Sequence, residues 1–247
     1  MINLGLNIER NIPTLIELAK RSGTVLYLDA RKVNGITLGI NSPLTSSILN
    51  LVNKTTSIDL YNFAGTTSDG YAILNDKPVI AFDGIDSYMT SSNIPELDIT
   101  GTQNFGISAI LQISVNQSGY VFSRNDTGYS DVRYGLLYEA GIFKLISSGV
   151  VLISSPAISL NTWYRISVIR DNGVLYMILN GVKVGQVAST TSLISASNFR
   201  IGCRVNGTSN SIFSGMKLGA FVITKGSKAT LHNGTKMMNA IERGFGF

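Results

Sequence analysis

The alternation of apolar and polar residues changes its period after the first 23 positions of the chain. Ile12, Leu15, Ile16 and Ala19 recur at helical spacing, and a basic pair precedes Gly23. This pattern predicts a short amphipathic helix within an N-terminal extension, residues 1–23. Its apolar face either packs on the domain that follows or docks the chain on a larger assembly, and packing is the favoured interpretation because such stripes are usually core.

From Thr24 onward, short segments rich in β-branched and aromatic residues alternate with turn signals, which predicts an all-β domain. Repeated strand-and-turn units roughly 8 to 12 residues apart are typical of a two-sheet antiparallel sandwich or jelly roll. The predicted strands are residues 25–29, 79–82, 87–91, 105–115, 120–124, 134–138, 142–146, 150–153, 163–169, 174–179, 182–188, 199–202 and 213–224.

The clearest turn is Asn180-Gly181, because this dipeptide tolerates the positive φ angles of a type I′ hairpin. Residues 34–70 form an irregular upstream segment in which the leucines and isoleucines between 44 and 51 offer one possible helical turn. Residues 235–243 predict a short helix in a C-terminal tail, 226–247. With no linker between 71 and 225, we expect one jelly-roll domain over residues 24–225.

Composition narrows the class of protein. Charged residues make up 14% of the 247 residues and hydrophobic residues 44%, so Ser, Thr, Asn and Gly must cover much of the surface, as in extracellular modules. The net charge of +5 is scattered, which argues against nucleic-acid binding. We also expect no signal peptide, no transmembrane segment and, for the single Cys203, the role of a small buried hydrophobe.

Several motifs, in order, resemble one family. The sequence of residues 79–88, VIAFDGIDSY, resembles the "F-D-G-x-D-D-Y" strand of concanavalin A-like, laminin G-like jelly rolls, and residues 94–109 resemble the loop and strand that follow it. Residues 161–171, NTWYRISVIRD, and the hairpin at 176–184 resemble later segments. The resemblance covers about residues 71–225, and residues 25–30 and 61–64 resemble the upstream segment that such proteins often carry. It implies an antiparallel sandwich whose concave face or rim loops often bind carbohydrate, in glycan-binding, adhesive or virion-surface proteins and, in a minority, laminarinase-type glucanases.

The acidic residues argue against catalysis. Retaining glycoside hydrolysis needs two carboxyl groups about 5 Å apart, which acids two or four positions apart on one strand supply. The predicted strands carry no such pair, and Glu139 stands at a predicted hairpin tip. His232 has no Ser or Cys partner in an activating motif, and one Cys with one His cannot close a zinc site. The sequence therefore predicts a protein without enzymatic activity.

Calcium is the one cofactor that the sequence leaves open. Asp83 and Asp86 could bind it with loop carbonyls, as many laminin G-like domains do. Two departures weaken this interpretation: Ser87 replaces the family's second acid, and Lys217 stands in the late motif where the family has acids. The alternative is that both carboxylates accept backbone N–H groups in a tight turn.

Glycan binding needs aromatic faces flanked by hydrogen-bonding side chains. Two segments have that mixture, and the alternative for both is a solvated turn. The candidate residues are Arg124, Asn125, Asp126, Tyr129, Asp131 and Arg133 in the first segment, and Asn206 and Asn210 in the second. Trp163 is expected to anchor the core rather than serve as an exposed platform.

These observations lead to one functional hypothesis. We expect a non-enzymatic phage virion surface protein, from a tail, baseplate or capsid, that forms a homo-oligomer within the assembly. Its sandwich would contact host polysaccharide or neighbouring virion proteins. The alternatives are a free-standing bacterial carbohydrate-binding module or adhesin and, third, a divergent glycoside hydrolase.

Overall fold

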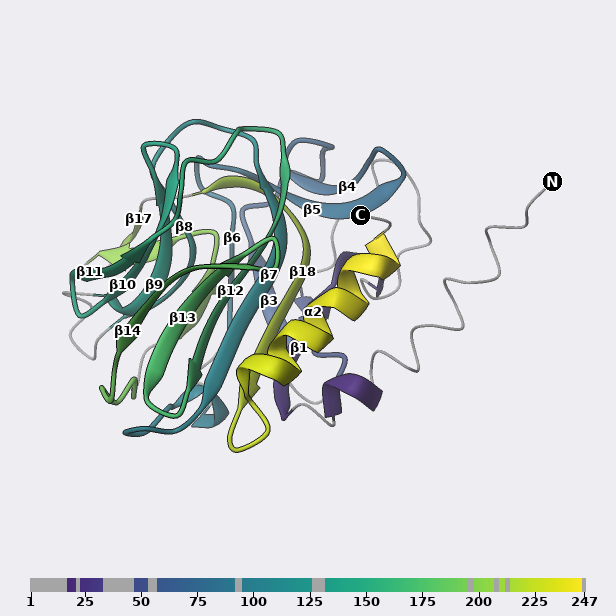
Figure 1. The fold of residues 1–247 in the computed structure, drawn as a ribbon. Coiled ribbons are helices and arrows are strands. Elements are labelled where there is room, and N and C mark those ends of the chain that lie inside the picture. Colours follow the sequence, from purple (N-terminus) through teal and green to yellow (C-terminus); the bar gives the residue numbers. More distant parts are fainter. Residues whose placement is uncertain are drawn as a thin grey trace.

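The computed structural model of the 247-residue chain describes residues 17–20, 23–32, 47–52, 57–91, 95–125, 132–194, 198–206, 209–211 and 214–245. Two antiparallel sheets face each other, and a C-terminal helix lies along the outside of one of them (Figure 1). The chain is therefore the jelly-roll sandwich that its periodicity predicts. A separate two-stranded ribbon, β16 (Arg204–Asn206) and β17 (Ser209–Ser211), completes the strands of the described residues.

Sheet A has the order β14-β13-β12-β7-β18-β5-β4, with β1 also paired to β18. Its strands are β1 (Thr24–Asp29), β4 (Gly70–Leu74), β5 (Lys77–Asp83), β7 (Phe105–Ile113), β12 (Trp163–Asp171), β13 (Val174–Leu179), β14 (Val182–Ala188) and β18 (Gly215–Lys225). The last strand, β18, pairs with β7 along its whole length. On its other side β18 pairs first with β5 and then with β1, so it lies in the middle of the sheet.

Sheet B has the order β11-β10-β9-β8-β15-β6-β3-β2. Its strands are β2 (Ser47–Leu49), β3 (Ser57–Tyr61), β6 (Tyr88–Thr90), β8 (Gly119–Asn125), β9 (Val132–Glu139), β10 (Ile142–Ser147), β11 (Val150–Ser154) and β15 (Phe199–Ile201). Two short 3-10 helices, η1 (Ala30–Lys32) and η2 (Pro95–Leu97), lie in the connections.

The segment predicted to be irregular, with one helical turn, contains strands. Ile48 of β2 pairs with Ile58 of β3, and both side chains are buried. The prediction of a helical turn at this point is wrong, because these strands of three and five residues are fixed by pairing: β2 pairs with β3, and β3 pairs with β6. The segment thus supplies one end of sheet B.

The core fills the space between the sheets with apolar residues from alternate strand positions. Phe122, Phe199 and Phe221 pack together there, with ring centroids 5.7 to 5.9 Å apart. Cys203 is buried as predicted, and burial raises the pKa of its thiol to about 12, so the thiol stays protonated. The Asn180-Gly181 hairpin is also confirmed, since both residues have positive φ, 50° and 83°.

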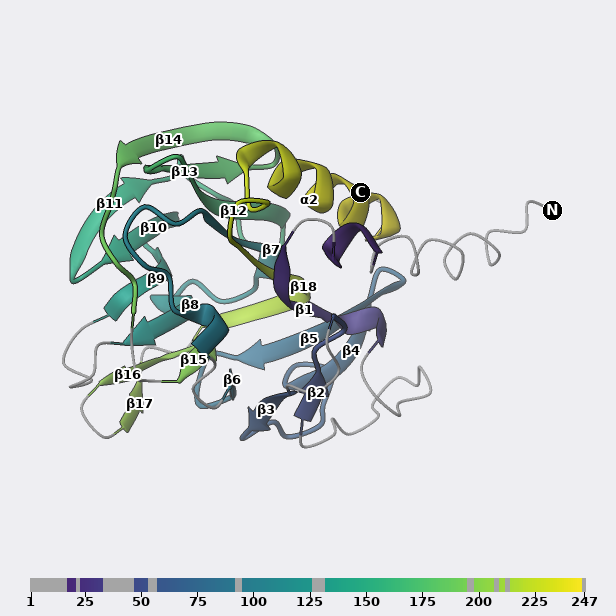
Figure 2. The same cartoon turned by 90° about the horizontal axis from the view of Figure 1, so that it is seen from below.

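A second apolar cluster lies between the outer face of sheet A and the helix α2 (Leu231–Phe245). The helix begins four residues earlier than predicted. The side chain of Thr230 accepts the Asn233 N–H, and Asp171 at the end of β12 accepts the Leu231 N–H at 3.0 Å. Residues 17–20 are helical and lie beside α2, with Ala19 fully buried in the cluster (Figure 2). Ile12, Leu15 and Ile16 lie outside the described residues.

Candidate functional site on the outer face of sheet B

The turn after β5 is built around the carboxylate of Asp83. Its Oδ1 accepts the N–H groups of Ile85 at 2.8 Å, Asp86 at 3.2 Å and Ser87 at 3.3 Å, and the Ser87 hydroxyl at 2.9 Å. Gly84 has φ of 81°, which the turn requires. Burial by itself raises the pKa of Asp83, but the hydrogen bonds outweigh it and the net pKa is lowered. These contacts are the ones that the tight-turn interpretation of Asp83 predicts.

A further carboxylate, Asp69, lies near this turn: burial raises its pKa, and the charges of Asp83 and Asp86 raise it further. The Asp86 backbone carbonyl accepts the Asn62 side-chain amide at 3.2 Å, and Asp86 itself is exposed. Within the described residues, no three His, Cys, Asp or Glu side chains are grouped as a metal ion requires. Calcium binding at this turn remains a prediction from the sequence.

The first predicted glycan segment begins inside the sandwich. Arg124 and Asn125 end β8 and are fully buried, and the Arg124 guanidinium pairs with Asp98 at 2.9 Å. The prediction that these two residues contact a sugar at the rim is wrong, because β8 extends through both of them and their side chains are buried. Arg133, near the start of β9, is partly buried. The candidates Asp126, Tyr129 and Asp131 lie outside the described residues.

The second predicted segment forms the β16–β17 hairpin, in which Asn206 pairs with Ser209 and Val205 with Asn210. The strand β16 packs beside β8, so the two predicted segments approach each other at one end of sheet B. Figure 2 shows the hairpin there, next to β15. Whether any of these residues contacts a glycan stays a prediction.

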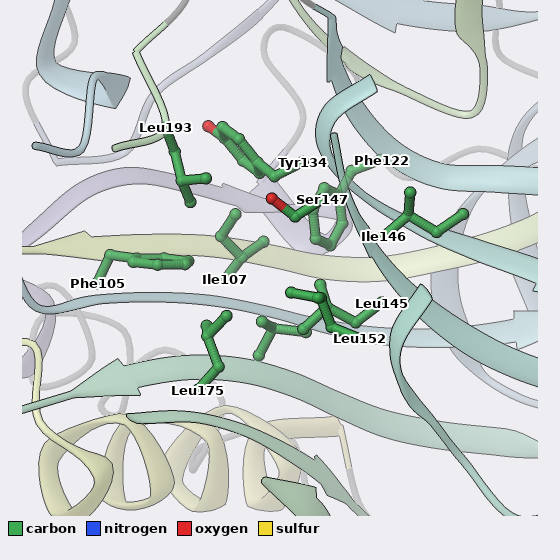
Figure 3. Close-up of a pocket in the computed structure, with 11 residues that line it drawn as sticks. Phe105, Ile107, Phe122, Tyr134, Leu145, Ile146, Ser147, Leu152, Leu175 and Leu193 are labelled. Atoms are coloured by element: carbon green, nitrogen blue, oxygen red, sulfur yellow. The ribbon is translucent and has the colours of Figure 1, made fainter. Parts of the chain in front are cut away.

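The gap between the two sheets is not a ligand site. Figure 3 shows its lining, which is apolar except for the hydroxyl groups of Tyr134 and Ser147 and includes Phe105, Leu145 and Leu193. Its volume is about 10 Å³, the space of roughly one water molecule. This gap is a packing seam of the core.

The outer face of sheet B carries a stacked pair of tyrosines. Tyr61 on β3 lies directly opposite Tyr88 on β6, their ring centroids are 5.0 Å apart, and their planes differ by 7°. Tyr61 is 43% exposed and Tyr88 partly so. Both side chains point away from the core because their neighbours Leu60 and Met89 point into it. The pair therefore places two partly exposed aromatic rings, stacked on each other, on the solvent-facing side of sheet B.

Charged side chains lie next to this pair on the same face. The register aligns Asp59 with Thr90 and Thr90 with Arg200, two positions from the tyrosine pair on β3 and β6. Asp59 and Arg200 are both partly exposed. Partly exposed aromatic rings flanked by a carboxylate and a guanidinium can contact the C–H face of a sugar ring and hydrogen-bond its hydroxyl groups. We call Asp59, Tyr61, Tyr88 and Arg200 the tyrosine face.

Sequence reasoning missed the tyrosine face. Tyr88 belongs to the family-like motif at residues 79–88, but Tyr61 lies in the upstream segment, which was predicted to be irregular. The β3–β6 register brings the two rings together. The available signal is the short alternation of polar and apolar residues at 57–60, which ends at Tyr61.

The sandwich and its aromatic surface define a lectin-like β module. The chain belongs to the concanavalin A-like lectin/glucanase superfamily, whose model matches residues 83–217. No curated protein sequence matches the chain significantly. No helix in the described ranges is long and apolar enough to cross a membrane.

Solved structures with this fold include proteins of different activities. The binding domain of paraclostridial mosquitocidal protein 1 superposes with a TM-score of 0.64 at 12% identity, over 90% of this chain and 52% of that one. Trypanosoma rangeli sialidase in complex with sialic acid superposes with a TM-score of 0.61 at 9% identity, over 96% of this chain and 38% of the sialidase. This chain thus spans about half the length of the former and two fifths of the latter. At these identities the likeness shows the fold alone.

Proposed function

We propose that the protein is a carbohydrate-recognition module that holds a sugar ring on its tyrosine face. The observation that carries this proposal is the exposed, parallel stack of Tyr61 and Tyr88. Large aromatic rings usually bury much of their area, and an exposed pair beside hydrogen-bonding groups is typical of surfaces that stack on sugars. Asp59 would accept from sugar hydroxyl groups and Arg200 would donate to them.

The module is proposed to bind and not to hydrolyse. Several carboxylates of the described residues pair with cations, among them Glu139 with Lys144 at 2.5 Å, Asp98 with Arg124, and Glu242 with Arg165. A retaining hydrolase instead needs two carboxyl groups about 5 Å from each other. A divergent glycoside hydrolase is the alternative, since the superfamily includes glucanases.

The setting that we propose is the surface of a phage or phage-like particle, in a tail, baseplate or capsid. There the sandwich would contact host glycan or neighbouring virion subunits. The low charge content and the virion-surface members of similar domains support this setting. Mass spectrometry of purified particles from the source culture tests it. If the protein is absent from particles, the free-standing bacterial module or adhesin becomes the better hypothesis.

A glycan array tests recognition, with two matched tyrosine variants. Tyr61→Ala should abolish binding to at least some of the glycans that the unaltered protein retains, namely those that stack on the tyrosine face. Tyr176→Ala is the control, because Tyr176 is also a partly exposed strand tyrosine, lies on sheet A and contacts Lys183. Equal binding by both variants would contradict the tyrosine face, and release of reducing sugar would show that the protein is an enzyme.

A further inference from the structure

A second cavity lies on the opposite side of the molecule, between α2 and the outer face of sheet A. Its volume is about 220 Å³. The helix packs there against β12, β7 and β18 (Figure 2). The lining residues come from four elements that are far apart in the sequence: Ile110, Trp163, Tyr164, Arg165, Asn180 and Glu242.

The cavity is lined by two kinds of residue, one apolar and one polar or charged. Ile110 belongs to the apolar cluster under α2. Trp163 packs against that cluster and is partly exposed. Arg165 of β12 is only 9% exposed, and its guanidinium bonds to Asn239 and, at 2.5 Å, to Glu242 of the helix. The cavity thus has an apolar, aromatic side and a side of charged and amide groups.

The Asn180-Gly181 hairpin turn holds the polar side in place. Asn180 Oδ1 accepts the Arg165 backbone N–H at 2.9 Å, and the Asn180 backbone N–H bonds to the Arg165 carbonyl at 2.8 Å. A side chain at Gly181 would meet the Arg165 guanidinium, so the turn also confines that group. Arg165 is therefore fixed by the helix on one side and by the turn on the other.

We propose that this cavity is a second binding site, for a single uncharged pyranose. Its volume is below the roughly 300–1,000 Å³ of sites for drug-sized molecules, so it accommodates one ring. A pyranose has an apolar C–H face for Trp163 and a hydroxyl edge for Arg165, Asn180 and Glu242. Because Arg165 and Glu242 neutralise each other, the site offers no net charge to an acidic sugar.

This site goes beyond the proposed function because it lies on the other sheet from the tyrosine face. A module with sugar sites on opposite faces can connect two glycan chains, or bind one surface while held to another. When linked glycans occupy both sites, the avidity would exceed the affinity of either site alone.

Tryptophan fluorescence tests the second site directly, since Trp163 is the only tryptophan in the sequence. The full chain is titrated with uncharged methyl pyranosides and, for comparison, with glucuronic acid. We expect a saturable change in emission with at least one uncharged sugar and none with the acid. A panel without any saturable change would overturn the proposal, as would a preference for the acid.

Variants of α2 test whether the change in Trp163 emission comes from sugar bound in this cavity. Glu242→Ala should weaken binding by roughly tenfold or more, as expected for one lost hydrogen bond to a charged group. Glu242→Gln, which keeps the side-chain length, is the second variant if Glu242→Ala melts early. Arg243→Ala, exposed on the same helix, should leave the titration midpoint unchanged. An unchanged midpoint in both Glu242 variants would overturn the site.

Tyr61→Ala separates this proposal from the tyrosine face. The Trp163 response should persist in that variant, because the two sites lie on different sheets. Loss of the response would overturn an independent second site. Failure of the tyrosine face on the glycan array would leave the fluorescence result standing, so the two proposals can fail separately.

Discussion

The fully buried guanidinium of Arg124 lies 2.9 Å from the carboxylate of Asp98, a side chain that is 27% exposed. Asp98 follows η2, and its neighbour Ile99 forms an isolated β-bridge with Leu193. The ion pair therefore ties the connection between β6 and β7 to the end of β8. It also explains why Arg124 is unavailable as a rim contact.

Asp98→Ala should destabilise the domain by about 3 kcal/mol, because it leaves a buried cation with less compensation. Thermal or denaturant unfolding measures the change. Glu96→Ala, an exposed acid in the same connection, is the matched control and should stay within about 0.5 kcal/mol of the unaltered protein. Equal stability of the two variants would show that Arg124 does not depend on Asp98.

Gly181→Val should destabilise the protein by more than the roughly 1–2 kcal/mol that positive φ costs an L-residue. Gly181 has φ of 83°, and an added Cβ would lie 2.4 Å from a guanidinium nitrogen of Arg165. Gly141→Val is the control, because Gly141 has a similar φ of 80° but open space around it. If both variants melt at the same temperature, the contact with Arg165 costs nothing and only backbone strain remains.

The lowered pKa of Asp83 predicts an acid-dependent loss of stability. A carboxyl whose pKa is lower in the folded state contributes stability above its unfolded pKa of about 3.9, and this contribution is lost as the pH falls through the folded value. Asp83→Asn should therefore be less stable than the unaltered protein at neutral pH, with the difference shrinking in acid. Melting curves from pH 7 down to pH 2 measure it. A difference that is constant with pH would contradict the ionised carboxylate as acceptor.

Asp171→Ala should cost about 1 kcal/mol, since it removes a side-chain acceptor at the first turn of α2. Asp171 accepts both the Leu231 N–H and the Asn104 side-chain amide, so it connects the helix to the sheet beneath it. Glu96→Ala, at an exposed acid in η2, is the control. Helix content measured by circular dichroism during melting would reveal whether α2 is released first.

Local signals predicted the fold where pairing is local. Asn180-Gly181 dictates its own turn between two strands rich in apolar residues, so their hairpin could be predicted from the sequence. Ile48 and Ile58 lie in strands of three and five residues, which are held by pairing with each other and, for β3, with β6. The helix α2 was predicted to begin four residues too late: its local cap, Thr230, was overlooked, and a second acceptor, Asp171, comes from sixty residues away.

The candidate sites were harder to predict for the same reason. Arg124 resembles a loop residue by composition, yet its strand continues into the core and an acid from another connection pairs with it. Trp163 was expected to anchor the core, and it does pack against the cluster under α2, but it also borders the cavity. Side chains that meet across sheets or under a helix come from distant segments, so no regular spacing in the sequence indicates that they are in contact.

The position of β18 has a consequence for biosynthesis. This strand lies between β7 on one side and β5 with β1 on the other, and it is the last strand of the described residues. Every strand up to β18 must leave the ribosome before sheet A can close, and until then β5 and β7 have open edges beside exposed apolar faces. A nascent chain stalled before Gly215 would therefore present two unpaired strand edges to its neighbours.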